Sequence, residues 1–218
     1  MNTQLNQILP AGDTPAATAT IAPVKQSVPK GPGGFLFYGI DFTENLSGSI
    51  VSMLKSALHF FAKEFSGHGK VARDSVAFLS YFGDFAGGAG IIGNWKFPAD
   101  LHLTTKFFGG KGGTMQIDEA ETCIWKLTHL YYIPERIMCA SAENIGAPIE
   151  VENANPHVTL ALNKWPARCS NDTIKASQNS DDAVFTQKVT VNREKHQLYV
   201  LRLSPAWLVK GHHKGYNS

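Results

Sequence analysis

The sequence predicts an α+β fold, in which many short strands and few helices form one folded domain. Several segments alternate apolar and polar residues or are rich in β-branched residues, as strands are. They lie near residues 35–40, 100–108, 121–132, 136–141, 156–162, 186–191 and 197–203. One long segment, from residues 45–49 to Gly67, instead has the periodicity of an amphipathic helix. Its apolar stripe consists of Ile50, Met53, Leu54, Ala57, Leu58, Phe61 and Phe65.

The segments between these elements complete the expected organisation. Residues 1–34 are rich in Thr, Ala, Pro and Gly and have no hydrophobic period, so we expect a flexible leader ahead of a single domain at residues 35–218. Residues 74–82 fit a short helix or a strand equally well. Glycines at positions 83, 87, 88, 90 and 93 predict a loop, Pro134 and Glu135 predict a hairpin turn, and residues 163–185 have room for a short helix.

Composition limits the classes of function. The chain has 218 residues, 43% of them hydrophobic, a net charge of +2 and three cysteines. This charge does not indicate a nucleic-acid coat, although it would not repel a small anionic substrate. Cys123, Cys139 and Cys169 have no zinc-ligand spacing, and we expect them to be buried thiols in a reducing, cytoplasmic setting. No apolar run approaches the roughly 18 residues that a membrane span needs.

Two copies of a His-x-Thr pattern carry most of the functional information. They are His102-Leu103-Thr104 and His157-Val158-Thr159, each within a strand-like segment. Side chains at positions i and i+2 of a strand point to the same face, so each copy presents an imidazole together with a hydroxyl. Two facing copies could supply both the acid and the base that hydrolysis of a phosphodiester needs. The alternative is two half-buried structural histidines and two threonines chosen for β-propensity.

The motifs and their surroundings resemble a known family. The matching segments are Phe37-Tyr-Gly-Ile40, Ser80-Tyr-Phe-Gly83, Leu101-His-Leu-Thr-Thr-Lys-Phe107, Pro156-His-Val-Thr-Leu160 and Val209-Lys-Gly-His-His-Lys-Gly-Tyr216. They resemble the 2H phosphoesterase superfamily and, within it, the catalytic domain of the 2′,3′-cyclic-nucleotide 3′-phosphodiesterase (CNPase) family, over roughly residues 35–216. The resemblance implies a two-lobed α+β fold, each lobe an antiparallel sheet flanked by helices, with the active-site groove between the lobes.

The resemblance also implies an activity. The expected reaction is hydrolysis of a nucleoside 2′,3′-cyclic phosphate to a 2′-phosphate, without a metal or another cofactor. In that scheme His157 is the base and His102 the acid, although the nearly symmetric motif does not decide the roles from the residues alone. Thr104 and Thr159 are expected to bind the phosphate. Phe107 is expected to bind the nucleobase, although strict strand alternation would direct it to the opposite face, into the core.

The sequence departs from the family pattern in several places. Asn155 stands where the family has a basic residue, and the connection after His157 is shorter. The family's vertebrate members also have an N-terminal kinase-like domain and a C-terminal prenylation box, neither of which is in this sequence. We therefore expect either a trimmed chain or a shorter relative.

Other motifs have structural interpretations. The glycine-rich segment at residues 109–113 lacks the spacing of a phosphate-binding loop, so we expect an ordinary turn. We expect His59 on a helix face, His129 in a structural role, and His212 and His213 in a solvated tail.

Two alternative functions stay open at this point. One is an RNA-end processing phosphodiesterase that acts on RNA with a 2′,3′-cyclic end. The other is a non-catalytic module that binds RNA or nucleotides.

Overall fold

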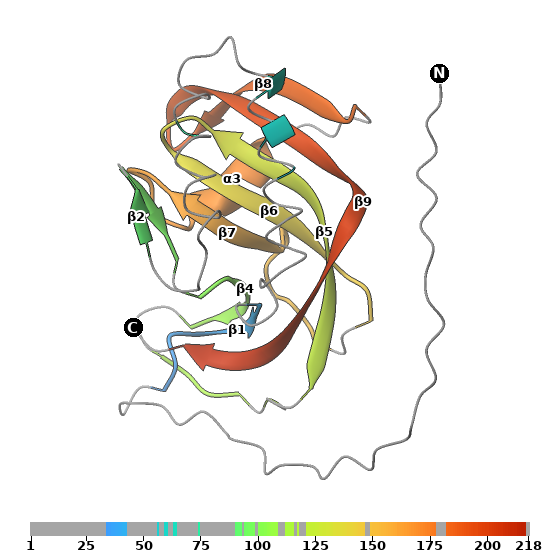
Figure 1. The fold of residues 1–218 in the computed structure, drawn as a ribbon. Helices are drawn as coiled ribbons and strands as arrows, with labels where there is room; N and C mark the ends of the chain where they lie inside the picture. The colour runs from blue at the N-terminus through green and yellow to red at the C-terminus, as the bar shows by residue number, and fades with distance from the viewer. Residues whose placement is uncertain are drawn as a thin grey trace, which may run out of the picture.

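The computed structural model describes most of the chain after residue 33 (Figure 1). The described residues are 34–42, 56, 59–60, 63–64, 74, 90–92, 94–98, 100–108, 112–115, 117, 121–146, 149–177 and 182–216. The leader expected at residues 1–34 lies outside them, except for Gly34. So does the apolar stripe of the expected long helix. The described positions of that segment are helical and exposed, and they include His59, which we expected on a helix face.

The described strands form one antiparallel sheet. They are β1 (Phe37–Asp41), β2 (Gly90–Ile92), β3 (Trp95–Phe97), β4 (His102–Phe107), β5 (Thr122–Ile133), β6 (Ile137–Asn144), β7 (His157–Leu162), β8 (Val184–Val191) and β9 (Glu194–Tyr216). Their order is β2-β3-β7-β4-β1-β9-β5-β6, and β8 pairs with β9. Because β7 also pairs with β6, six of these strands close into a ring.

This architecture corrects the expected fold class. The described part of the chain is predominantly β, whereas we expected two separate α+β lobes flanked by helices. A single short helix, α3 (Cys169–Ala176), is described over its whole length. The strands form one sheet instead of two lobes because β9 is long enough to pair with β8 at one end, with β5 in the middle and with β1 at the other end. In Figure 1, β9 runs from the upper part of the molecule to the lower part.

Local sequence signals identify most of the described elements correctly. The predicted hairpin at Pro134 and Glu135 joins β5 to β6, and Glu135 has a φ of 59° in this turn. The short helix predicted within residues 163–185 is α3. The predicted glycine loop is wrong at Gly90, which begins β2, and its other glycines lie outside the described residues. Of residues 74–82 the structure describes only Asp74, which is helical.

Two hydrophobic cores support the sheet. The larger core includes Ile40, Leu103, Trp125 and Val158, contributed by β1, β4, β5 and β7. The second core packs α3 against the sheet and consists of Tyr131, Ile133, Ile137, Cys139, Trp165, Cys169, Val189, Val191, Leu198 and Val200. All three cysteines are buried, as predicted, and are free thiols.

The C-terminal half of β9 approaches β1 very closely at Gly211. A Cβ atom at Gly211 would lie 2.4 Å from the backbone oxygen of Asp41, so this position admits no side chain. The contact brings the end of β9 to the edge of the site described below. The sequence prediction of a solvated tail at His212 and His213 is therefore wrong, since both residues lie in the sheet and His213 is 3% exposed.

A buried carboxylate connects the segment before β2 to the sheet. Asp74 accepts hydrogen bonds from Trp95 Nε1 at 2.9 Å, from the Tyr132 hydroxyl, and from the backbone N–H of Glu135 at 2.9 Å. Burial, followed by the charge of Asp74, raises the pKa of Tyr132, so this hydroxyl stays a donor. The three donors come from β3, β5 and the β5–β6 turn.

We predict that Asp74→Ala lowers the free energy of unfolding by about 3–5 kcal/mol, because it leaves several buried donors without an acceptor. Urea unfolding followed by circular dichroism measures this change. Glu150→Ala, which removes an exposed carboxylate, is the control and should stay within about 0.5 kcal/mol of the wild type. Equal stability of the two variants would refute the role given to Asp74.

Candidate active site

The register of β4 and β7 places both His-x-Thr motifs on one face of the sheet. Leu103 pairs with Val158 in antiparallel register, and both side chains are buried in the larger core. Because side chains alternate along a strand, the flanking His and Thr residues of both motifs point to the opposite, outer face. In this register each His is next to the Thr of the other motif.

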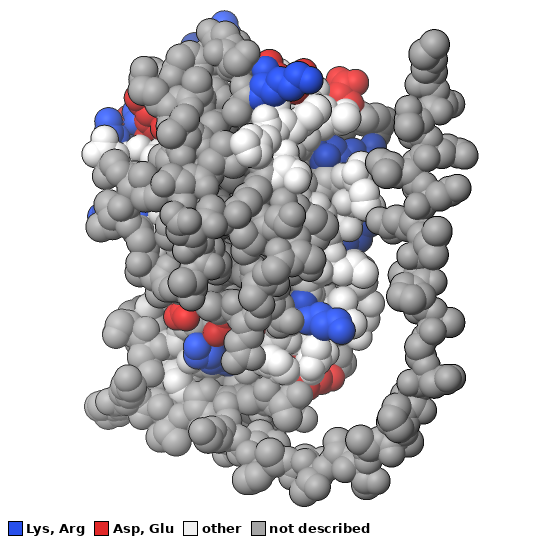
Figure 2. All heavy atoms as spheres, in the orientation of Figure 1, with Lys and Arg blue, Asp and Glu red and all other residues white. Residues whose placement is uncertain are grey.

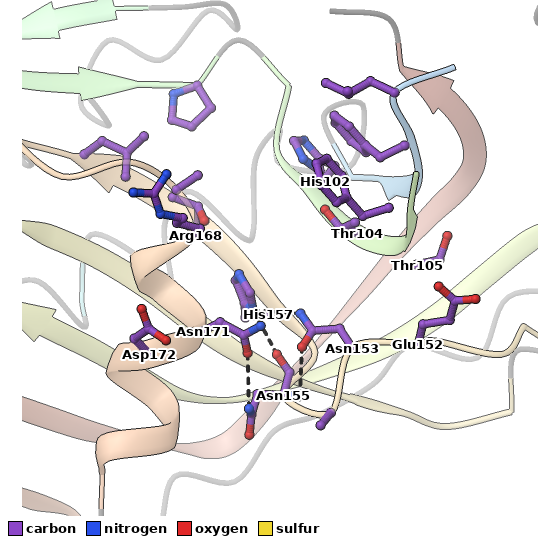
Figure 3. Close-up of a pocket in the computed structure, with 18 of the residues that line it drawn as sticks. His102, Thr104, Thr105, Glu152, Asn153, Asn155, His157, Arg168, Asn171 and Asp172 are labelled. Carbon is purple, nitrogen blue, oxygen red and sulfur yellow. Dashed lines mark hydrogen bonds between the residues drawn. The ribbon is translucent and has the colours of Figure 1, made fainter. Parts of the chain in front are cut away.

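These four side chains line one cavity of about 910 Å³. Figure 3 shows His102 and Thr104 on one side and His157 on the other, with α3 forming a further wall. The remaining lining residues come from the start of β1, from β3 and β4, from the loop before β7 and the end of β7, and from α3 with the residues just before it. They are Leu36, Phe37, Lys96, Phe97, Pro98, Thr105, Phe107, Glu152, Asn153, Ala154, Asn155, Leu162, Ala167, Arg168, Asn171, Asp172 and Lys175.

His102 is held by a carbonyl group and by two aromatic rings. Its Nδ1 lies 3.1 Å from the backbone oxygen of Asp100. Because a carbonyl only accepts, Nδ1 carries the proton and Nε2 is the atom available for proton transfer. The imidazole stacks on Phe37 at 5.0 Å between ring centroids and tilts over Tyr216 at 4.8 Å. Phe37 and Tyr216 also stack on each other at 4.6 Å, so the three rings form one cluster.

His157 has the same tautomer for the same reason. Its Nδ1 donates to the backbone oxygen of Asn155 at 2.8 Å, and Asn153 Nδ2 lies 3.4 Å from the same nitrogen. Two further contacts hold this loop in place. The Asn155 backbone N–H donates to Asn153 Oδ1 at 3.0 Å, and Asn155 Nδ2 donates to Asn171 Oδ1 on α3 at 3.1 Å. The position of His157 therefore depends on α3 through these hydrogen bonds (Figure 3).

Burial dominates the electrostatics of both histidines. It lowers the pKa of His102 and of His157, because a half-buried imidazolium loses hydration. At His102 the hydrogen bond to Asp100 and the carboxylates of Asp100 and Asp41 act against this, while the charge of His157 adds to it. At His157 the opposing contact is the Asn155 carbonyl. Nearby carboxylates thus favour the charged form at His102 in particular.

The two threonines differ in their surroundings. Thr159 Oγ1 lies 2.9 Å from Ser170 Oγ on α3, and either hydroxyl can donate. Thr104 lines the cavity beside His102 and lies opposite Gly39 of β1. A side chain at Gly39 would place its Cβ 2.7 Å from the Leu103 carbonyl oxygen, so β1 adds no side chain beside Thr104.

Thr105 belongs to the opposite face of β4, as alternation predicts. It is 1% exposed, and its Oγ1 lies 2.9 Å from His213 Nε2. His213 is thus a buried partner of the site strand. The sequence gives no local signal for this, because the alternation of small and large residues from Val209 to His212 breaks at the adjacent His213.

Phe107 lines the cavity because the β1–β4 register shifts between Tyr38 and Gly39. Gly39 pairs with Thr104 but Tyr38 pairs with Lys106, so Thr105 is an extra residue and the strand contains a bulge. After the bulge Phe107 pairs with Phe37 and is 62% exposed. Of the two alternatives for Phe107, the packed core position is therefore wrong. Its contact with a nucleobase stays a prediction.

Several residues of the site were not identified from the sequence. Asn153, Arg168, Asn171 and Lys175 belong to no motif, and only the tertiary structure brings them to the cavity. Tyr216 ends a segment that resembles the family, but only the tertiary structure shows that its ring lies against His102. Among the described residues, no three His, Cys, Asp or Glu side chains are placed to hold a metal ion. No helix in the described part of the chain is long and apolar enough to span a membrane.

Charged side chains are unevenly distributed around the cavity. Lys96, Arg168 and Lys175 line it, together with the acidic Glu152 and Asp172. Glu152 forms an ion pair with Lys106 at 2.8 Å, which leaves Asp172 to offset the three cations. On the face shown in Figure 2 the described Lys and Arg residues are instead spread apart, with acidic residues between them.

Comparisons with known proteins assign no family. No protein family matches the sequence, and no curated protein does either. A solved structure described as a fungal RNA kinase is distantly similar, with 13% sequence identity and a TM-score of 0.47. The alignment covers 85% of this chain and 46% of that one, so the chain spans about half its length.

We predict that Asp41→Asn lowers the pKa of His102 below its wild-type value. Asp41 pairs with His102 across β1 and β4, and its carboxylate favours the imidazolium. Titration of the imidazole C–H resonances by NMR measures this change. His157 is the internal control, because Asp41 does not contribute to its pKa shift. An equal shift at both histidines, or none at His102, would contradict this electrostatic description.

Proposed function

We propose that this protein hydrolyses 2′,3′-cyclic phosphates at the end of a nucleotide or an RNA, using the two His-x-Thr motifs. The product expected from the family resemblance is a 2′-phosphate. The observation that carries the proposal is the Leu103–Val158 register, which leaves the His and Thr of both motifs together on the outer face, around one cavity.

The tautomers of the two histidines support acid–base chemistry. Hydrolysis needs a base that activates water on one side of the phosphorus and an acid that protonates the leaving 3′ oxygen on the other. Both imidazoles bind a carbonyl through Nδ1–H, so each offers Nε2 to the cavity. Neutral Nε2 accepts a proton from water, and protonated Nε2 donates one.

The different surroundings of the histidines support an assignment of these roles. His102 has Asp41 and Asp100 as neighbouring carboxylates and two aromatic rings against its own ring, and all of these favour an imidazolium. His157 has only the carbonyl of Asn155 in this capacity. We therefore assign His102 as the acid and His157 as the base.

Thr104 and Thr159 complete the mechanism as phosphate-binding groups. Negative charge develops on the non-bridging oxygens as water attacks, and a hydroxyl donor stabilises it best in a site that excludes water. Ser170 can donate to Thr159 Oγ1, which leaves the Thr159 proton for the phosphate. Phe107 is exposed and lines the cavity, which supports a role in stacking on a base.

Turnover and binding measurements distinguish this proposal from a non-catalytic module. Uridine 2′,3′-cyclic phosphate incubated with the protein in the presence of EDTA should be converted to uridine 2′-phosphate. Binding without turnover of either a cyclic mononucleotide or a cyclic-ended RNA would instead support a non-catalytic module. A 3′-phosphate product would refute the assignment of the leaving oxygen.

We predict a graded loss of kcat/KM across the motif residues. His102→Ala and His157→Ala should each lose at least about 10²–10⁴-fold, because each removes a proton-transfer group. Thr104→Ala and Thr159→Ala should each lose roughly ten- to a hundred-fold, the effect of one hydrogen bond to a charged oxygen. His129→Ala, in β5, is the control and should keep near-full activity. A His102→Ala variant with wild-type turnover would overturn the mechanism.

We predict a bell-shaped pH profile of kcat/KM with both limbs at acidic pH. One histidine must be neutral and the other protonated, and the free enzyme determines this profile. Burial lowers the pKa of both groups from the usual value near 6.5, so both apparent pKa values of the pair should lie below it. Rates of cyclic-phosphate hydrolysis at constant ionic strength test this. A profile that is flat between about pH 5 and 8 would contradict the two-histidine scheme.

A further inference from the structure

Helix α3 presents two different faces. Cys169, Ser170 and Thr173 are buried against the sheet. Arg168, Asn171 and Lys175 follow at intervals of three and four residues, so they share another face, and all of them line the cavity. Figure 3 shows Arg168 and Asn171 on this wall, beside His157. The helix therefore supplies a polar, cationic wall to the candidate active site.

The cations around this wall have no acidic partner in the described part of the chain. Some other described cations are paired, as in the bridges of Lys126 with Glu143 at 3.2 Å and of Lys214 with Asp41 at 3.0 Å. No described carboxylate lies within ion-pair distance of Arg168 or Lys175, or of Lys96 at the edge of β3.

The side-chain amide of Asn171 provides an N–H donor on the same wall. Its Oδ1 accepts the hydrogen bond from Asn155, so its Nδ2 is oriented away from that contact and can donate elsewhere. Asp172 shares the helix with these groups and can accept from a ribose hydroxyl, which is a donor in RNA. The wall therefore has partners for both a phosphate and a ribose.

The wall and the two histidines can hold separate phosphates. In the proposed mechanism the reacting phosphate lies between His102 and His157, beside the two threonines. Arg168 and Lys175 are seven residues apart, which corresponds to about 10 Å along the helix axis. The cavity is also large, since about 910 Å³ is near the upper end of the roughly 300–1,000 Å³ range of ligand sites. A second anionic group therefore fits beside the first.

We infer that Arg168, Asn171 and Lys175 bind the phosphodiester one nucleotide upstream of the reacting phosphate, so that the preferred substrate is an oligonucleotide with a 2′,3′-cyclic end. This inference rests on the proposed function, and it adds the class of substrate and the residues that select it. Arg and Lys contacts to phosphates, helped by amide donors, provide most of the affinity of proteins for nucleic acids.

The test compares two substrates with the same reacting end. Uridine 2′,3′-cyclic phosphate has no upstream phosphate, and uridylyl-uridine 2′,3′-cyclic phosphate has one. The wild type should have the higher kcat/KM on the dinucleotide. The double variant Arg168→Gln/Lys175→Gln should reduce this preference about tenfold, an effect of the size expected for lost charge-assisted hydrogen bonds. Lys188→Gln/Lys210→Gln, which removes the same charge from exposed positions of β8 and β9, should keep the preference.

Salt dependence provides an independent measurement. Each phosphate that a protein neutralises on a single strand adds about −0.7 to the slope of log affinity against log salt concentration. The wild-type slope of kcat/KM should therefore be steeper for the dinucleotide than for the mononucleotide by about this amount. In Arg168→Gln/Lys175→Gln the two slopes should coincide.

Three outcomes would overturn the subsite. In the first, Arg168→Gln/Lys175→Gln loses equal activity on both substrates. In the second, that variant keeps the wild-type preference for the dinucleotide. In the third, the control Lys188→Gln/Lys210→Gln loses the preference to the same extent.

If the wild type hydrolyses neither substrate, the proposed function fails, and a binding measurement then tests the subsite separately. Calorimetry with uridylyl-uridine 2′-phosphate and uridine 2′-phosphate should then show tighter binding of the dinucleotide, lost only in Arg168→Gln/Lys175→Gln. Equal binding of the two would refute the subsite.

Discussion

The candidate site depends on the burial of two residues between the motif positions. Leu103 and Val158 are 0% and 3% exposed and pair across β4 and β7. A slip of one residue in either strand would move its His and Thr into the core and an apolar residue onto the outer face. Such a slip would expose apolar surface and bury polar groups, and both changes cost free energy. The hydrophobic effect therefore determines where the polar groups of the site lie.

Once the four side chains share a face, the packing around them determines their chemistry. Water is partly excluded from both imidazoles, which lowers their pKa values, and the carbonyls of Asp100 and Asn155 orient the rings. The distinction between the two histidines comes from their neighbours, because the motifs themselves are nearly identical. Asp41 lies on β1 next to His102, and His157 has no equivalent carboxylate among the causes of its pKa shift.

Segments distant in sequence complete the surroundings of each motif. The end of β9 provides Tyr216, which lies against the His102 ring, and His213, which bonds to Thr105 on the other side of β4. Helix α3 provides Asn171, which holds the loop before His157, and Ser170, which bonds to Thr159. Each motif is thus supported by a different element, β9 for the first and α3 for the second.

The sequence by itself determined the local structure of the described elements. Alternation identified the strands at both motifs, the turn residues identified the hairpin at Pro134 and Glu135, and the pairing of His with Thr identified the candidate catalytic groups. The strand predictions succeed because backbone geometry sets the period of side chains along a strand, whatever the strand pairs with. The catalytic role of the His and Thr residues stays a prediction. Only the tertiary structure decided which strands meet. The closed ring in place of two α+β lobes, the bulge that exposes Phe107, the burial of His213 and the cationic wall of α3 all depend on non-local pairings. Such pairings are selected by the burial of the whole chain, and no local period records them.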